Sequence, residues 1–330
     1  MAGSVMAGPA LARAIRSDFI DTWKRRYEAS RAKLGKCMEF GVSSDNLVEL
    51  YGYGETPIYP RRTEWGVAPE RKPHIYRNYE VENYRWTAEV DWLRVHRELS
   101  NLKDIERRAR GAGDNFGTLE ERLFYQVLTA GADRQLLEAI PLAPDGAALH
   151  AALAEGADRF GVSGGNVVSG QTITTGAGFR SAIVNVQNRF LDFQDTEGEP
   201  AMDESVLERG LTVIYPNVRR EQAMEAFIQA LTSQEVSTSN AGVSNFVLDA
   251  GMKITLVPTQ RLTVATTAFV FIDDFDIKPI FSQIAKPLWE MYYDQSNSVE
   301  HGRTGHESVV YEEWLGIGVN LPLGTCSITA

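Results

Sequence analysis

A serine between glycines is the first feature of the sequence that could do chemistry. Gly161, Ser163 and Gly165 have the G-x-S-x-G spacing in which a serine on a sharp turn attacks a carbonyl carbon. That turn must follow a strand and lead into a helix, whereas here a predicted helix precedes it and β-prone residues follow it. The pattern therefore predicts a glycine-rich loop, and a hydrolase that uses Ser163 is kept only as the least favoured alternative.

Carboxylates and imidazoles offer two candidate metal sites. Asp273, Asp274 and Asp276 carry hard oxygen ligands that suit a divalent cation, but they lie between two β-prone runs, where acidic residues are typical of a turn. His301 and His306 are five residues apart in a polar loop with no third ligand nearby in the sequence. Phosphate-loop, dinucleotide-binding and C-x-x-C motifs are absent. We therefore expect no catalytic residue, no cofactor and no metal, and a protein that is not an enzyme.

The composition places the chain in a broad class. It has 330 residues, of which 43% are hydrophobic and 23% charged, as is typical of globular proteins. No apolar run approaches the roughly 18 residues that span a membrane, and the first ten residues lack the regions of a secretory signal. Cys37 and Cys326 stand alone near opposite ends, which fits a reducing compartment. We expect no contact with a membrane.

Charge is distributed unevenly along the chain. Residues 1–110 carry 20 basic and 16 acidic side chains, whereas residues 111–330 carry 13 and 28. The first 36 residues alone hold eight basic side chains against three acidic ones. Such a basic segment can contact nucleic acid or the acidic face of a neighbour, and it can equally be the solvated surface of a helix. Charge alone leaves these alternatives open.

Two segments of the first third have clear patterns. Residues 11–36 predict a helix, because apolar side chains recur about every four residues and Gly35 follows them. Its apolar stripe must be buried against the same chain or another. Residues 47–90 are rich in tyrosine, tryptophan and proline, and predict a long two-stranded hairpin with a proline- and arginine-rich tip at 57–73. An isolated hairpin is marginal in water, so we expect this one to dock on a partner or on the body.

The rest of the chain mixes helices and strands. A helix is predicted over 102–131, with a break at 111–113 and a capping box formed by Thr118 and Glu121. Further helices are predicted at 147–159, 180–193 and 216–231. Strands are predicted at 211–215, 245–257, 262–272, 278–284, 308–319 and 325–329, and a polar loop at 291–307. Because strands and helices do not alternate strictly, the fold class is α+β. Projecting segments on such a body suit an assembly subunit, in which many weak contacts add together.

This order of parts resembles the major capsid proteins of tailed phages with the HK97-type fold, and in particular the Mu-like major head subunit group. The likeness lies in the strand, proline and helix that begin at 211–216, in the strands 267–272 and 278–283, and in the returning strand 311–320. The tail 323–330 departs from the group, whose members close with an aromatic-rich strand.

The resemblance implies a division of the chain into an arm, an extended hairpin called the E-loop, and two domains. The implied ranges are 1–46 for the N-terminal arm, 47–90 for the E-loop, 91–145 and 279–315 for a peripheral domain with a long spine helix, and 146–278 and 316–330 for an axial domain. The E-loop would overlap an adjacent subunit, and the loop 291–307 would meet other capsomers near local threefold axes.

The resemblance also implies a function. The chain would be a structural major capsid protein that assembles through hexamers and pentamers into an icosahedral shell around double-stranded DNA. It would be assembled in the host cytoplasm and be part of the virion. Its partners would be copies of itself, then portal, scaffold and decoration proteins, with non-specific DNA contact on the inner face. An encapsulin-like nanocompartment shell of the same fold is the alternative.

Inter-subunit contacts are expected from basic and aromatic residues of the projecting segments. The candidates are Arg25 and Arg26 in the arm, Arg61, Arg62, Trp65, Lys72 and Tyr76 in the hairpin, and Arg303 in the polar loop. Some members of the resembled family join subunits by a lysine–asparagine isopeptide bond. Lys72 has a suitable place for one, but no residue of this sequence marks the glutamate and asparagine that it needs, so we expect no such bond.

Overall fold

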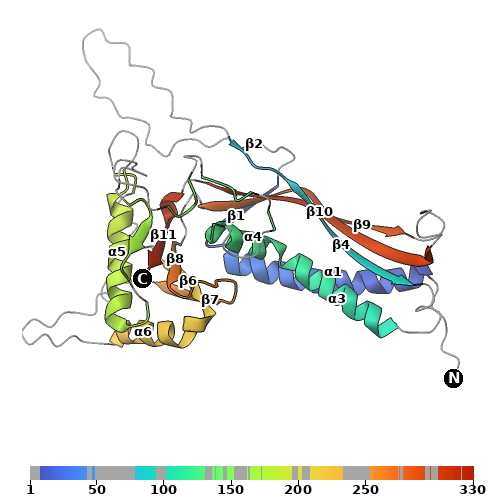
Figure 1. Ribbon diagram of the computed structural model, residues 1–330, viewed down its shortest axis with the longest axis horizontal. Helices are drawn as coiled ribbons and strands as arrows, with labels where there is room; N and C mark the ends of the chain where they lie inside the picture. Colours follow the sequence, from blue (N-terminus) through green and yellow to red (C-terminus); the bar gives the residue numbers. More distant parts are fainter. Residues whose placement is uncertain are drawn as a thin grey trace, which may run out of the picture.

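The computed structural model has two large sheets, one two-stranded sheet and five main helices among the residues that it describes (Figure 1). It describes residues 8–42, 47–48, 79–93, 102–130, 136–137, 139–143, 147–151, 162, 164–171, 173–194, 200–202, 209–232, 253–273, 275, 278–293, 298, 304–320 and 322–330. The helices are α1 (Gly8–Leu34), α3 (Leu102–Gly117), α4 (Leu119–Leu128), α5 (Gly176–Asp192) and α6 (Arg220–Thr232), with short 3₁₀ turns η2 (Asn217–Arg219) and η3 (Pro322–Gly324).

The longer sheet runs along one half of the molecule. Its strands are β1 (Met38–Val42), β9 (Ile280–Tyr293), β10 (His306–Val319) and β4 (Tyr84–Leu93), in that order. β9 and β10 form a long antiparallel ribbon, β4 pairs antiparallel with β10, and β1 pairs parallel with β9. The four strands thus bring together the first third of the chain and its last fifth.

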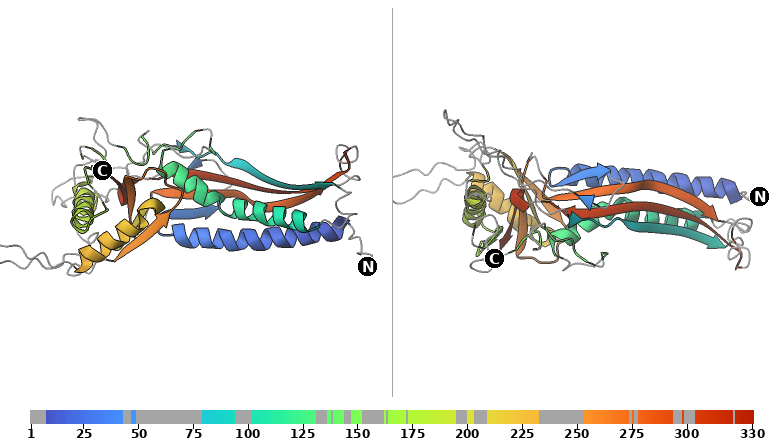
Figure 2. Two further views of the ribbon diagram at one scale, coloured as in Figure 1. Left: turned by 60° about the horizontal axis from the view of Figure 1, so that its bottom comes forward. Right: turned by 90° about the horizontal axis from the view of Figure 1, so that it is seen from above.

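Helices α1 and α3 lie side by side on one face of this sheet (Figure 2). The stripe Leu11, Ile15 and Phe19 of α1 is fully buried against α3 and the sheet, and the Phe19 ring stacks on Tyr311 of β10 at 3.5 Å between centroids. The helix predicted at 11–36 is therefore confirmed. Its stripe is buried on its own chain, which resolves the alternative that the sequence left open.

The predicted helix at 102–131 needs two corrections. No break occurs at 111–113, because α3 continues to Gly117. Close packing of α1 on α3 accounts for the glycine at position 113, since a Cβ there would lie 2.6 Å from the Phe19 carbonyl oxygen of α1. The capping box is also wrong: Thr118 makes no cap hydrogen bond, and its hydroxyl instead donates to carbonyls of the preceding turn. The chain there passes from α3 to α4 without a true N-cap.

The second sheet lies at the other end of the molecule (Figure 1). Its strands, in order, are β5 (Val167–Ser169), β11 (Thr325–Thr329), β8 (Thr267–Ile272), β6 (Leu211–Pro216) and β7 (Ile254–Thr259). Helices α5 and α6 pack with it around a core that includes Phe179, Phe190 and Val270. The helix predicted at 180–193 is confirmed. The one predicted at 216–231 exists but begins at Arg220, because Pro216 ends β6 and residues 217–219 form a 3₁₀ turn. The start of the one predicted at 147–159 is not confirmed, since residues 147–151 are irregular.

The predicted hairpin begins as expected and ends earlier. Its base consists of β2 (Leu47–Val48) and β3 (Tyr79–Glu80), which pair antiparallel; residues 49–78 lie outside the described part. From Tyr84 onward the chain belongs to β4 of the long sheet, because alternate residues such as Val90 are buried under the helices.

The predicted loop 291–307 is also shorter than expected, since β9 extends to Tyr293 and β10 begins at His306. Among the described helices, none is long and apolar enough to cross a membrane.

Candidate functional site

The residues with catalytic or metal-binding spacing do not form a site in the described structure. Ser163 lies outside the described residues, and the glycines that follow it form a turn that leads into β5. Asp273 is buried, pairs with Lys36 and accepts a hydrogen bond from Thr212 at 2.6 Å. Asp274, Asp276 and His301 are not described, and the described residues contain no cluster of three potential metal ligands. Asp273 thus has a structural role.

The basic arm uses many of its charges within the chain. Arg26 pairs with Asp114 of α3, and Arg16 with Glu290 of β9 at 3.0 Å. Arg25 points outward and has no ion-pair partner among the described residues. The other contact candidates of the sequence, Arg61, Arg62, Trp65, Lys72, Tyr76 and Arg303, lie outside the described part.

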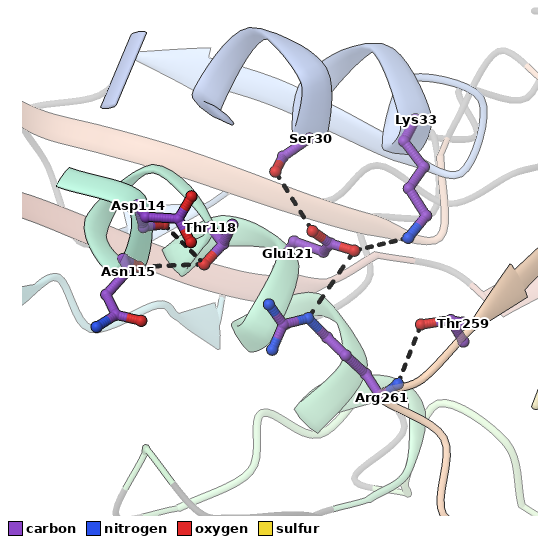
Figure 3. Close-up of polar contacts among 8 residues, drawn as sticks. All are labelled: Ser30, Lys33, Asp114, Asn115, Thr118, Glu121, Thr259 and Arg261. Atoms are coloured by element: carbon purple, nitrogen blue, oxygen red, sulfur yellow. Dashed lines mark hydrogen bonds and ion pairs between the residues drawn. The ribbon is translucent and has the colours of Figure 1, made fainter. Parts of the chain in front are cut away.

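Ion pairs at the end of α1 join the two halves of the molecule. Three successive cations, Arg31, Lys33 and Lys36, pair with Glu120, Glu121 and Asp273. Figure 3 shows the middle pair, in which Glu121 of α4 lies between α1 and the connection from β7 to β8. Lys33 Nζ is 2.7 Å from one Glu121 oxygen, and Ser30 Oγ donates to the other at 3.4 Å.

The same Glu121 carboxylate also contacts Arg261, whose Nε is 3.9 Å away (Figure 3). A carboxylate that is only 12% exposed thus receives cations from two segments of the chain. Pairs that lose much of their water are screened less by salt than fully exposed ones. This junction therefore fixes α1 and α4 against the second sheet.

The neighbouring pair is more deeply buried. Arg31 donates two hydrogen bonds to Glu120, at 2.9 and 2.8 Å, and its guanidinium lies over the rings of Tyr27 and Phe40 at 4.3 and 4.4 Å. Ser282 of β9 donates to Glu120 at 2.9 Å. Bidentate pairing and ring stacking both use the planar shape of arginine, which lysine lacks.

A second carboxyl lies beside this pair. Glu313 of β10 is 4% exposed and faces Glu120 and Arg31. Burial, followed by repulsion from Glu120, raises the pKa of Glu313 to about 7, while attraction to Arg31 opposes the rise. Burial chiefly raises the pKa of Tyr27 as well, beyond its ordinary range. Glu313 is thus a buried acid whose pKa lies well above its ordinary value.

The face of the long sheet that points away from α1 and α3 carries an aromatic and charged cluster. Because side chains alternate along a strand, burial of Tyr311 under the helices places Glu312 and Trp314 on the opposite face. Trp314 Nε1 and Arg85 Nε donate to Glu312 at 2.9 and 2.7 Å. No described helix covers this face (Figure 2), and Trp314 is 38% exposed there.

A further pair extends this cluster onto β9. The Lys286 ammonium lies 4.1 Å from the centroid of the Trp289 ring. Lys286 pairs in register with Trp314, and Trp289 with Glu312. We name Arg85, Lys286, Trp289, Glu312 and Trp314 the open-face cluster. Tryptophan and arginine are the residue types most enriched where proteins bind one another, so this cluster is the candidate contact surface of the described structure.

Comparison with known proteins finds the same fold among solved structures. No family model matches the chain, and no curated protein is similar to it in sequence. Solved structures are similar. The capsid of a native GTA particle has a TM-score of 0.52 at 11% identity, over 90% of this chain and 89% of that one. A virus-like particle from Pyrococcus furiosus has 0.51 at 8% identity, over 95% and 97%.

A third similar structure, of Mycobacterium phage Patience, has a TM-score of 0.50 at 11% identity, over 94% of this chain and 86% of that one. The chain has the HK97-like capsid fold. This confirms the α+β class and the fold that the sequence resemblance implied. The narrower likeness to the Mu-like group finds no support in these comparisons and stays a prediction.

Proposed function

We propose that the chain is the major capsid protein of a tailed phage, which assembles through hexamers and pentamers into an icosahedral shell around double-stranded DNA. The observation that supports this function is the likeness of fold along nearly the whole chain to the chains of three particles. A shell subunit needs shape and contact surfaces rather than a catalytic centre. The contacts can each be weak, because many of them add in a closed assembly.

The proposed division of labour follows the resemblance. Residues 91–145 and 279–315 form a peripheral domain, and residues 146–278 and 316–330 an axial domain around the capsomer centre. The arm, 1–46, and the hairpin, 47–90, complete the subunit. The hairpin crosses an adjacent copy, for which the open-face cluster is a suitable receiving surface. Scaffold, portal and decoration proteins, and DNA on the inner face, are the further proposed partners.

An encapsulin-like nanocompartment of the same fold is the less supported alternative, because two of the three similar particles are, by name, a capsid and a phage. The contents of particles from the natural source separate the two. Nuclease-protected double-stranded DNA supports the capsid, whereas a protein cargo supports the compartment. Labelling of Ser163 by a fluorophosphonate would instead support the hydrolase alternative.

The first experiment is to produce the chain alone and examine it by size-exclusion chromatography and negative-stain microscopy. Closed particles, or capsomers that close when concentrated, are the expected result. A monomer or dimer at every concentration tested, with or without a co-expressed scaffold, would overturn the proposal.

A further inference from the structure

The ribbon of β9 and β10 has two irregularities in its register, one on each side of Trp314, and the first of them lies at Glu313. Glu312 pairs with Trp289 and Trp314 pairs with Lys286, so two residues of β9 lie opposite the single Glu313. An extra residue in one strand of an antiparallel pair bends the ribbon and increases its twist. One of those two residues is proline at position 287, which has no amide hydrogen to donate. The ribbon therefore bends where Glu313 faces the helices.

Three elements surround the Glu313 side chain. Helix α1 brings Tyr27 and Arg31, and helix α4 brings Glu120. On β4 the residue opposite in register is Trp86, which does not titrate. Both hydrogen bonds that Arg31 makes in this cluster go to Glu120. An ionised Glu313 would thus have to share one guanidinium with another buried carboxylate.

We propose that Glu313 is a protonation switch that sets how firmly α1 and α4 are held against the bent ribbon. With Glu313 neutral, the cluster of Arg31, Glu120 and Glu313 carries no net charge, and the helices stay closed on the sheet. With Glu313 ionised, the cluster carries a net charge of −1 in a buried place. A buried charge without its own partner is costly, so water enters and the helices open from the ribbon more often.

The switch belongs to the single chain, whereas its use rests on the proposed function. A closed shell places identical subunits in positions that differ in curvature, and a few residues at a hinge can absorb such a difference. The register irregularity at Glu313 is the proposed hinge, and the charge of Glu313 shifts the balance between the closed and the open form. A change of pH around neutrality would then shift subunits between a closed and a more open form.

The test is amide hydrogen exchange of the full chain, kept as unassembled subunits, between pH 6 and pH 8 after correction for intrinsic exchange. If the pKa is about 7 in the closed form and ordinary in the open one, the opening equilibrium of α1 and α4 should rise roughly tenfold over this range. Helix α5, which packs in the other core, serves as the internal reference.

The deciding comparison uses Glu313→Gln, which keeps the shape and removes the charge. Its opening should not change with pH. The matched control is Glu307→Gln, on the same face of β10 and equally buried, which should keep the tenfold rise. If Glu313→Gln shows the same rise as the natural chain, or if the natural chain opens α1, α4 and α5 alike, the switch is excluded. Because the measurement uses single subunits, failure to form shells cannot produce either outcome.

Discussion

Arg31 on α1 and Glu120 on α4 are 89 residues apart in the sequence and are joined by two parallel hydrogen bonds of 2.9 and 2.8 Å. The Glu120 side chain is only 4% exposed, whereas that of Arg31 is 29% exposed. Ser282 donates to the same carboxylate, so one buried anion fixes α1, α4 and β9 relative to one another. The long sheet and its helices thus meet at a defined point.

Replacing Arg31 by alanine should lower the free energy of unfolding by about 3 kcal/mol, because it leaves the buried Glu120 carboxylate without its cation. Urea unfolding followed by circular dichroism measures the loss. The control is Arg25→Ala, an exposed arginine on the same helix, for which a change within about 0.5 kcal/mol is expected. Equal effects of the two substitutions would contradict the role of the pair.

Two of the three glycines of α3, Gly111 and Gly113, should respond to alanine in opposite directions. A Cβ at Gly113 would lie 2.6 Å from the Phe19 carbonyl oxygen, so the helices must separate; overpacking of this kind costs about 1–3 kcal/mol. At Gly111 nothing lies within 4 Å, and alanine should stabilise the helix by about 0.5–1 kcal/mol. The thermal unfolding midpoints of both variants, compared with that of the natural chain, test these opposite changes in stability. Stabilisation by Gly113→Ala would mean that α1 and α3 do not pack this closely.

The elements could be predicted where their signal is local. The stripe of Leu11, Ile15 and Phe19 defines a helix and its buried side whatever lies against it, and β11 was predicted at its observed bounds. Tertiary contacts leave no such signal. Gly111 and Gly113 resemble a helix break in the sequence, because spacing does not reveal that a second helix crosses α3 there.

The candidate site was less predictable for the same reason. The charge of the arm predicts contact with nucleic acid, with a neighbour or with solvent, yet Arg31 and Lys33 pair with acids of their own chain about 90 residues away. Adjacent glutamates such as Glu120 and Glu121 suggest a helix start, and nothing in their spacing marks them as buried ion-pair partners. Glu313 likewise follows another glutamate in an ordinary strand. Its importance comes from the bend and from the carboxylate across from it.

The stability of the subunit should fall as the pH rises from about 4.5 to about 7. The pKa of Glu313 is raised to about 7 in the folded chain from an ordinary value near 4.5, so the folded state binds more protons in this range. The contribution is complete below the lower value and lost above the higher one, and amounts to at most about 3 kcal/mol.

Urea unfolding at several pH values, for the natural chain and for Glu313→Gln, isolates this contribution from that of other titrating groups. The variant should be the more stable of the two above pH 7, and the difference should shrink as the pH falls. Glu307→Gln is again the control, and should follow the natural chain. A difference between Glu313→Gln and the natural chain that stays constant with pH would contradict the prediction.

Replacing Trp314 should weaken assembly more than it weakens the stability of the folded subunit. Its ring is 38% exposed on the open face, so Trp314→Ala should change the unfolding free energy of the subunit by no more than about 1 kcal/mol. If a neighbouring copy covers the ring, each contact loses about 2 kcal/mol, and the concentration needed for assembly rises roughly 30-fold. Light scattering against concentration measures this threshold. Lys103→Ala, exposed on α3 across the sheet, is the control and should leave the threshold unchanged; an unchanged threshold for Trp314→Ala as well would remove the open face from the inter-subunit contacts.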